Sequence, residues 1–355
     1  MAEGITQDRI RIAAAQYPIE LLPSFEAWEA KLARWVEEAV VRGADCLVFP
    51  EYAAMELAGT DPAAAGDLAA SLELVIALGE AYDAACRALA VKHGIVLLGG
   101  SRPFRRDDGI VVNRARLHTP DGGGGYQDKI VMTRFERELW GVSGGDTIQV
   151  IDTPAGLVGI AICFDVEFPL IARAQAEAGA RLILAPSATD TMQGFWRVRI
   201  GAQARALENQ CFVVQASTVG LADWLPALDE NQGAAGVFCP PDGNTPHDGV
   251  VASGEPSQPG WTYADIDLGE VAAWRSRGSV LNFAQWPEQA VAVPPRHAAA
   301  PVGQVFVALA QSDARLADEV AARIGITLPE PCVPGVAANA RLLQVHTDTL
   351  RGPVR

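Results

Sequence analysis

The first part of the chain alternates short apolar runs with longer stretches in which apolar residues recur at helical spacing. Residues 9–16 (RIRIAAAQ) predict a strand, and residues 46–50 (CLVFP) predict a buried strand. Residues 24–43 predict a helix between them, with Ser24 as its N-cap and Gly43 as its stop. One face of this expected helix is apolar: Phe25, Trp28, Leu32, Trp35, Val36 and Val40.

The same alternation continues, and strands then gather late in the chain. Further helices are expected at residues 62–93, 169–180, 194–210 and 268–278. Further strands are expected at residues 95–100, 110–120, 122–130, 157–163, 181–187, 211–217, 233–239, 249–253 and 261–268. Asp-Gly and Gly-Gly pairs near residues 121–125 predict a hairpin turn. The pattern therefore predicts a layered α/β domain whose sheet is mixed rather than parallel.

A change of composition marks the end of this domain, which we expect to span residues 8–287. Residues 291–301 (VAVPPRHAAAP) are rich in proline and alanine and predict a linker. Residues 305–310 then predict a strand, and residues 313–325 predict a helix. Residues 288–355 thus form a C-terminal extension, which is interpreted as a dimer arm, a docked appendage or a disordered segment.

Composition and charge exclude several classes of function. The 355 residues carry a net charge of −15, and the pI is about 4.8, which opposes binding to nucleic acid or to an anionic membrane. No apolar run approaches the ~18 residues of a membrane span, and the first ten residues lack the apolar core of a signal peptide. The six cysteines form no CxxC pair, so we expect a reduced, cytoplasmic protein without a disulfide scaffold or metal site.

Cys163 is the candidate nucleophile. It ends the apolar run 157–163, shortly before the helix expected from Pro169. A thiol attacks a carbonyl only as the thiolate, so it needs a base or a positive neighbour. The alternative is an ordinary buried cysteine. Two acids, Asp165 and Glu167, break the apolar run after it and favour the reactive interpretation.

Glu51 and Lys129 supply the groups that such a thiol needs. Glu51 directly follows the strand expected at residues 46–50, where burial makes a carboxylate a usable proton acceptor. Lys129 ends the expected hairpin, where an ammonium could stabilise an oxyanion. Glu136 and Glu138 follow, and one more carboxylate would keep the lysine charged and oriented. The alternative for each residue is a solvated position in a loop.

These segments together resemble the nitrilase (carbon–nitrogen hydrolase) superfamily over residues 8–285. The resemblance lies in FPE at 49–51, in GIAICFD at 159–165, and in the lysine arm, which has Lys129, ER at 136–137 and WG at 140–141. This registration selects Glu136, rather than Glu138, as the second glutamate of the family. The resemblance implies a four-layer α-β-β-α sandwich that pairs through its helices into homodimers or larger assemblies.

The resemblance also implies a mechanism. Glu51 takes the proton of Cys163, and the thiolate attacks an amide carbon. Lys129 and the backbone N–H of Phe164 hold the oxyanion. Ammonia or an amine leaves, protonated by Glu51, and water cleaves the thioester. No metal or organic cofactor takes part.

Departures from the family pattern indicate the substrate class. True nitrilases place Trp-Glu after the cysteine, whereas Phe164-Asp165 here looks more like the amidase and carbamoyl-hydrolase branches. The implied substrate is a small linear amide or carbamoyl compound. The ω-amidase-like branch has an arginine shortly after the cysteine, where this chain has Val166-Glu167. A neutral or cationic substrate is therefore favoured, although Glu167 is equally explained as an acid at a helix N-terminus.

Residues 187–210 resemble uncharacterised members of the superfamily, some of which are joined to acetyltransferase domains. We predict that the substrate pocket draws on this stretch and on residues beside the catalytic segments. The pocket candidates are Tyr52, Asp165, Glu167, Thr189, Asp190, Phe195 and Trp196. Phe195 and Trp196 are equally explained as the first apolar contacts of the next helix.

Three further functions use the same fold. An acyltransferase would pass the acyl group to an acceptor other than water, and a nitrile hydrolase would act on a nitrile at the same site. An inactive binding or scaffold protein is less supported, because all four catalytic candidates are present.

Overall fold

A computed structural model describes residues 8–291 and 312–351 of the chain. Contacts divide the chain into two compact units, Met1–Ala290 and Val291–Arg355, which are described separately here. The strands of the first unit are β1 (Arg9–Pro18), β2 (Cys46–Val48), β3 (Val96–Arg105), β4 (Val111–His118), β5 (Gly124–Asp128), β6 (Val150–Thr153), β7 (Gly156–Ile160), β8 (Leu182–Ser187), β9 (Phe212–Leu221), β10 (Glu230–Asn231), β11 (Gly236–Phe238), β12 (Val250–Ser253) and β13 (Gly260–Asp267).

Helices of several lengths connect these strands. The α-helices are α1 (Phe25–Val41), α2 (Pro62–Ala65), α3 (Leu68–His93), α4 (Arg134–Glu138), α5 (Pro169–Glu177), α6 (Met192–Asn209), α7 (Glu270–Arg277) and α8 (Asn282–Gln285). Short 3-10 helices are η1 (Ala53–Thr60), η2 (Cys163–Glu167) and η3 (Trp286–Val291).

Hydrogen bonds join the main strands into one sheet in the order β5-β4-β3-β2-β1-β9-β8-β7-β6. Strand β1 connects its two halves, because residues 12–14 pair with β2 and residues 16–18 pair with β9. Both of these pairings are parallel, whereas β13 runs antiparallel to β1 and β11 runs antiparallel to β9. The sheet is therefore mixed, as the sequence predicts.

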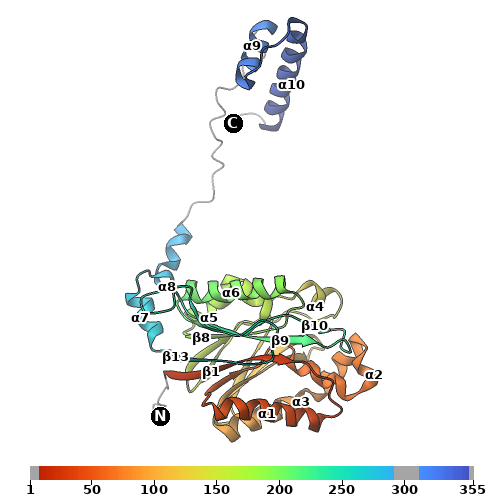
Figure 1. Cartoon of the computed structure of the whole chain (residues 1–355), viewed down its shortest axis with the longest axis vertical. Coiled ribbons are helices and arrows are strands. Elements are labelled where there is room, and N and C mark those ends of the chain that lie inside the picture. Colours follow the sequence, from red (N-terminus) through yellow and green to blue (C-terminus); the bar gives the residue numbers. More distant parts are fainter. Residues whose placement is uncertain (1–7, 292–311, 352–355) are drawn as a thin grey trace. The chain divides into compact units, whose positions relative to one another are not determined.

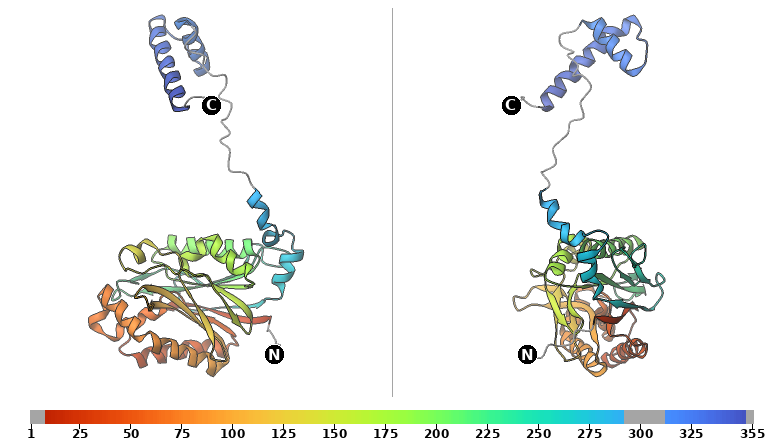
Figure 2. Two further views of the ribbon diagram at one scale, coloured as in Figure 1. Left: turned by 180° about the vertical axis from the view of Figure 1, so that it is seen from behind. Right: turned by 90° about the vertical axis from the view of Figure 1, so that its left-hand side faces the viewer.

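The two halves of the sheet pack face to face between two layers of helices. Figures 1 and 2 show α1 and α3 on one outer side of the strands and α5 and α6 on the other. Side chains alternate between the faces of a strand, so β1 serves two cores. Ile12 and Ala14 lie in the core between the sheet halves, whereas Ala13 and Tyr17 pack toward α1 and α3. The architecture is the four-layer α-β-β-α sandwich that the resemblance implies.

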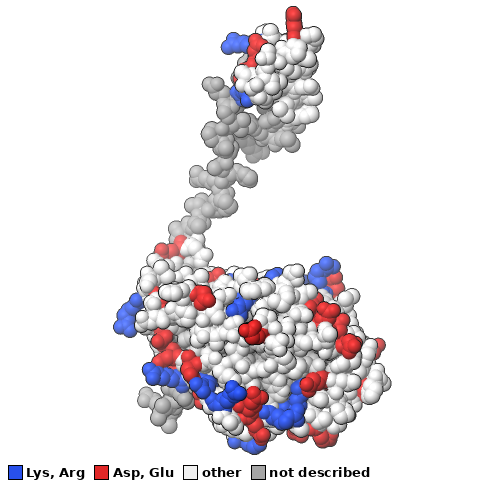
Figure 3. Space-filling model, in the orientation of Figure 1, with Lys and Arg blue, Asp and Glu red and all other residues white. Residues whose placement is uncertain are grey.

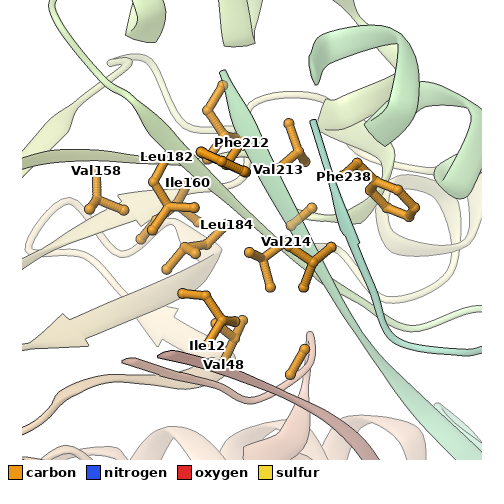
Figure 4. Packing of buried hydrophobic residues seen from close by; sticks show 14 of the residues in the cluster. Ile12, Val48, Val158, Ile160, Leu182, Leu184, Phe212, Val213, Val214 and Phe238 are labelled. Atoms are coloured by element: carbon orange, nitrogen blue, oxygen red, sulfur yellow. The ribbon is translucent and has the colours of Figure 1, made fainter. Parts of the chain in front are cut away.

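The core between the sheet halves fixes the ends of several strands. In Figure 4, Ile12 and Val48 of one half lie opposite Ile160 and Leu184 of the other. All four side chains are buried. Strands β2, β7 and β8, to which three of them belong, end where the candidate catalytic segments begin, so this core sets the spacing of those segments.

Local sequence signals explain how several helices begin and end. The Ser24 side chain caps α1 by accepting a hydrogen bond from the Ala27 N–H, and Gly43 follows the helix in the left-handed region at φ +79°. The helix predicted over residues 62–93 is interrupted. Asp67 caps a new helix, α3, by accepting from two backbone N–H groups of its first turn.

The second unit contains two helices, α9 (Asp313–Ile324) and α10 (Val333–Arg351), joined by a short 3-10 segment, η5 (Glu330–Cys332). The helix predicted at residues 313–325 is confirmed as α9, whereas α10 was not predicted. Leu316 and Ala337 form the small core between these helices. The strand predicted at residues 305–310 lies outside the described residues.

Acidic and basic side chains are interspersed on the face of the first unit drawn in Figure 3. No helix within residues 8–291 or 312–351 combines the length and the apolar character that crossing a bilayer requires. The absence of nucleic-acid and membrane partners stays a prediction.

Candidate active site

Glu51 and Cys163 both lie just beyond the end of a buried strand, at points where the backbone turns sharply. Tyr52, the residue after Glu51, has φ +56°, and Cys163 itself has φ +47°. Such left-handed conformations are unfavourable for side chains larger than glycine, and they concentrate at functional sites. The Tyr52 N–H donates to Ser101 Oγ at 2.9 Å, which holds the first turn in place. The two turns project Glu51 and Cys163 away from the ends of β2 and β7.

Lys129 reaches this place from a third segment and joins two carboxylates. It follows β5, and its backbone N–H donates to the Asn113 carbonyl on β4 at 2.9 Å. The side chain is 1% exposed, and its Nζ donates to Glu51 Oε1 at 2.8 Å and to Glu136 Oε2 at 2.6 Å. An ammonium group has three N–H donors. Within the described residues two of these are used by the glutamates, which leaves one for a substrate oxygen.

Glu136 is held at its position by the first turn of α4. Thr133 caps this helix, and its backbone N–H and Oγ1 donate to Glu136 Oε2 at 2.9 Å and 2.8 Å. The Tyr52 hydroxyl donates to Glu136 Oε1 at 2.8 Å. The capping box therefore fixes a buried carboxylate against the lysine.

Cys163 lies beside Glu51 and the peptide of Ala188, which follows β8. Its Sγ donates to the Ala188 carbonyl at 3.5 Å, and the Ala188 N–H donates to Glu51 Oε2 at 3.1 Å. A side-chain hydrogen bond with Glu51 also contributes to the pKa of the thiol. Cys163 is 4% exposed, and the charges of Glu51 and Lys129 both act on the pKa of its thiol. The structure thus brings together all four catalytic candidates.

The pKa values of the two glutamates are pushed in opposite directions. Burial raises the pKa of Glu51 above its usual range, and the Glu136 charge adds to this, against the Lys129 charge. Burial also acts upward on the pKa of Glu136, but the Lys129 charge and hydrogen bonds from Lys129 and Thr133 outweigh it and hold that pKa below its usual range. Glu136 therefore stays ionised, and Glu51 is the carboxylate suited to exchange a proton.

The lysine and the thiol respond to the same charges. Burial alone would lower the pKa of Lys129, but the charges of Glu51 and Glu136 raise it above its usual value. Burial and the Glu51 charge raise the pKa of the Cys163 thiol well above its usual value, against the Lys129 charge. These shifts favour the charged form of Lys129 and the neutral form of the Cys163 thiol, and a neutral thiol becomes a nucleophile only when a base takes its proton.

Phe164 follows Cys163 at the start of η2. N–H groups in the first turn of a helix have no acceptor within that helix. The Phe164 ring packs edge-on against Phe168, with 4.9 Å between centroids. The role of the Phe164 backbone N–H as an oxyanion donor beside Lys129, which the resemblance implies, stays a prediction.

Asp165 links the cysteine turn to the lysine arm, a task that differs from the predicted role in the substrate pocket. Its buried carboxylate accepts from the Ile130 N–H at 3.0 Å and from the Val131 N–H at 2.8 Å. These are the two residues that directly follow Lys129. Asp165 therefore ties the lysine arm to the cysteine turn. Its place in the substrate pocket stays a prediction.

We expect Asp165→Asn to lower turnover by about 10- to 100-fold, because one backbone N–H would face the amide nitrogen and the lysine arm would shift. Stability should respond to pH. Burial raises the pKa of Asp165 from 3.8 to about 7, so this group's contribution to stability is full below pH 3.8 and is lost as the pH rises through 7. Urea unfolding at several pH values should show this decline in the parent and a flatter profile in the variant. Unchanged turnover and an unchanged profile would contradict the assigned task.

The remaining pocket candidates occupy different environments. Thr189 is half-buried and donates through Oγ1 to the Gln232 carbonyl at 2.6 Å, and Phe195 is a buried residue of α6. Glu167 forms an ion pair with Arg197 at 3.6 Å. The exposed candidates are Asp190 and Trp196, and the latter is 50% exposed. Tyr52 touches the catalytic group itself through Glu136, whereas the structure shows no such contact for these five residues.

Sequence reasoning missed Asn113 and Ala188. The side-chain amide of Asn113 donates to Glu51 Oε1 at 2.9 Å and to Glu136 Oε1 at 3.4 Å. One signal was visible in the sequence, since Asn113 is an uncharged polar residue in the middle of a predicted strand. In the structure it is fully buried. Ala188 acts through its backbone, so its residue type carried no signal. Within the described ranges no group of three or more His, Cys, Asp or Glu side chains is placed to hold a metal ion.

Comparisons with known proteins place the chain in a family. A family model described as carbon-nitrogen hydrolase matches residues 11–276. "Probable hydrolase YhcX" of Bacillus subtilis is 34% identical over 274 residues, which cover 77% of this chain and 53% of that protein. An aliphatic nitrilase of Sinorhizobium fredii is 30% identical over 201 residues, which cover 54% of this chain and 63% of that one.

The solved structures show the same fold. Nit3 of Saccharomyces cerevisiae, described as a member of branch 10 of the nitrilase superfamily, matches with a TM-score of 0.61 and 22% identity. The match covers 83% of this chain and 99% of that chain. By contrast, the chain spans about half to two thirds of the length of the two curated relatives above. The family model covers most of the chain, and the chain belongs to the carbon–nitrogen hydrolase family.

Proposed function

We propose that the protein is a thiol-dependent hydrolase that cleaves the C–N bond of a small linear amide or carbamoyl compound through a thioester on Cys163. The observation that carries this proposal is the single ammonium of Lys129 held between two buried carboxylates beside a cysteine on a left-handed turn. This set contains a base, a nucleophile and a cationic oxyanion donor within one buried cluster.

The proposed reaction follows from the donors and acceptors of the site. Glu51 accepts the Cys163 proton while sulfur attacks the carbonyl carbon, and the carbonyl oxygen becomes an oxyanion held by Lys129 and the Phe164 N–H. The C–N bond then breaks, and Glu51 returns the proton to the leaving nitrogen. Water, deprotonated by Glu51, attacks the thioester and releases the acid and the free thiol.

One feature of the sequence supports an amide rather than a nitrile. Phe164-Asp165 follows the cysteine, which looks more like the amidase and carbamoyl-hydrolase branches than the Trp-Glu of true nitrilases. The similarity to an aliphatic nitrilase favours the nitrile as the second candidate. A panel of linear amides, carbamoyl amines and nitriles, assayed for ammonia release, tests the choice. Turnover of amides or carbamoyl compounds supports the proposal, and turnover of nitriles alone would overturn the substrate class.

Acyl transfer is the remaining active alternative. The same thioester could be cleaved by an amine or an alcohol in place of water. Product analysis separates the two outcomes, since a free acid identifies hydrolysis and a new amide or ester identifies transfer. A protein that processes none of the panel while binding its members would be the inactive scaffold.

We also propose that the protein forms a homodimer or larger homo-oligomer through its outer helices. Leu170 on α5 and Trp196 and Ile200 on α6 are large apolar side chains that are at least half exposed. We expect Ile200→Glu to shift the protein toward a smaller species in light scattering. Ile110→Glu, at an exposed apolar position before β4, should leave the assembly unchanged. A monomeric parent would contradict the proposal.

A further inference from the structure

We propose that the side-chain amide of Asn113 is a positioning group for the catalytic cluster, fastening Glu51 and Glu136 on either side of Lys129 so that Glu51 is the acid that exchanges the proton. This inference rests on the proposed function and assigns a task to a residue that contacts three members of the cluster.

Asn113 touches each of these members through a different atom or bond. It lies on β4 and is 0% exposed. Its Nδ2 donates to Glu51 Oε1 at 2.9 Å and, through a longer bond, to Glu136 Oε1 at 3.4 Å. Its backbone carbonyl accepts from the Lys129 N–H at 2.9 Å. One strand residue thereby fixes the separation of the two carboxylates and the start of the lysine arm.

The orientation of this amide is determined by its neighbours. A primary amide has two N–H donors on nitrogen, and the two carboxylates use both. Turning the amide by 180° would place Oδ1 against carboxylate oxygens, which cannot donate. In the observed orientation Oδ1 is buried and has no hydrogen-bond partner among the described residues. A buried acceptor without a partner is unfavourable. The hydrogen bonds from Nδ2 to the two carboxylates offset this unfavourable term for Oδ1.

Removing the Asn113 amide should affect Glu51 more than Glu136. Glu136 would keep its hydrogen bonds from Lys129, Thr133 and Tyr52. Glu51 would keep only those from Lys129 and the Ala188 N–H, together with the thiol. The ionised form of Glu51 would thus lose one of its few donors. It would then take up a proton at higher pH, and the thiol would lose its base there.

The test follows the alkylation of Cys163 by iodoacetamide as a function of pH, a reaction that needs no substrate. Cys332 is exposed, so Cys332→Ser serves as the parent, and peptide mass spectrometry reads the label on Cys163. Asn113→Leu keeps a similar volume without a donor. The acid limb of the profile is the pH range in which the alkylation rate of Cys163 falls as the pH is lowered. We expect this limb to lie about one to two pH units higher in Asn113→Leu than in the parent. A residue that only filled space would not move this limb.

Asn209→Leu is the matched control. Asn209 is also 0% exposed, its Nδ2 donates to the Arg205 carbonyl at 3.0 Å, and its Oδ1 has no partner within the described residues. This variant should keep the acid limb of the parent. Asn113→Ser, whose short hydroxyl cannot bridge two carboxylates, should shift the limb in the same direction as Asn113→Leu.

The outcomes separate the inference from the function beneath it. An unshifted limb in folded Asn113→Leu, with amide turnover intact in the parent, would overturn the role of Asn113 and leave the hydrolase standing. A shifted limb in a protein that hydrolyses no amide would support the role and reject the proposed substrate class. Loss of folding in both Asn113 variants, while Asn209→Leu folds, would overturn a positioning role that is separable from stability.

Discussion

Replacing Cys163 with alanine is expected to lower hydrolysis by about 10⁴-fold or more, since no other group in the cluster can form the acyl intermediate. The fold should survive. The substitution removes one sulfur atom, and alanine tolerates the left-handed backbone at φ +47° about as well as cysteine does. We expect a stability change of about 1 kcal/mol, typical of a single substitution. Ammonia release and thermal unfolding, measured on the same preparation, provide the two readouts.

A second buried cysteine gives the control for this experiment. Cys86 lies on α3 and is 0% exposed, but it belongs to the core under that helix and not to the catalytic cluster. Cys86→Ala should therefore retain turnover while losing a comparable amount of packing. Activity that persists in Cys163→Ala and disappears in Cys86→Ala would reject the assigned nucleophile.

Lys129→Met should produce the largest combined loss of activity and stability. The substitution leaves Glu51 and Glu136 buried, close together and without their shared cation. Turnover should fall by at least about 100-fold with the loss of the oxyanion donor. Stability near neutral pH should fall by about 3–5 kcal/mol, the usual effect of breaking a buried ion pair.

The pH dependence of this loss has a definite sign. Without Lys129, burial and mutual repulsion raise the pKa values of both glutamates above those of the unfolded chain. The destabilisation should therefore be largest at high pH and should shrink as the pH falls and the carboxylates take up protons. Urea unfolding at pH 5 and pH 8 measures it. Lys92→Met, which breaks an exposed ion pair with Glu37, should leave turnover and stability nearly unchanged. A Lys129→Met protein as stable as the parent at pH 8 would contradict the claim that Lys129 stabilises the two buried glutamates.

The signals that single out the catalytic candidates in the sequence are local. Glu51 and Cys163 each follow an apolar run, and the end of a buried strand is where an α/β fold presents functional groups. The resemblance of the ER and WG pairs after Lys129 to the family pattern selected Glu136 as the second glutamate. In the structure Glu136 contacts the lysine, whereas Glu138 pairs with Arg134 at the surface. Helix α1 was likewise predictable from Ser24, Gly43 and one apolar face.

The supporting contacts could not be read in the same way, because they join residues far apart in the chain. Asn113 lies 62 positions from Glu51, and the Ala188 peptide lies 137 positions from it. Asp165 was a pocket candidate because it follows Cys163 and breaks the apolar run. Its partners are backbone N–H groups of the lysine arm, which residue types do not reveal. Likewise, the break between α2 and α3 depends on the Asp67 cap within an alanine-rich stretch that favours helix throughout.

The central claim is that the sulfur of Cys163 carries the acyl group during the reaction. Mixing the protein with a substrate amide, quenching in acid within a turnover and mapping peptides by mass spectrometry tests it most directly. We predict an acyl mass on the peptide that contains Cys163, appearing before the free acid and decaying as the acid accumulates. Full turnover with that peptide unmodified at every time point, or with the acyl group on another residue, would contradict it.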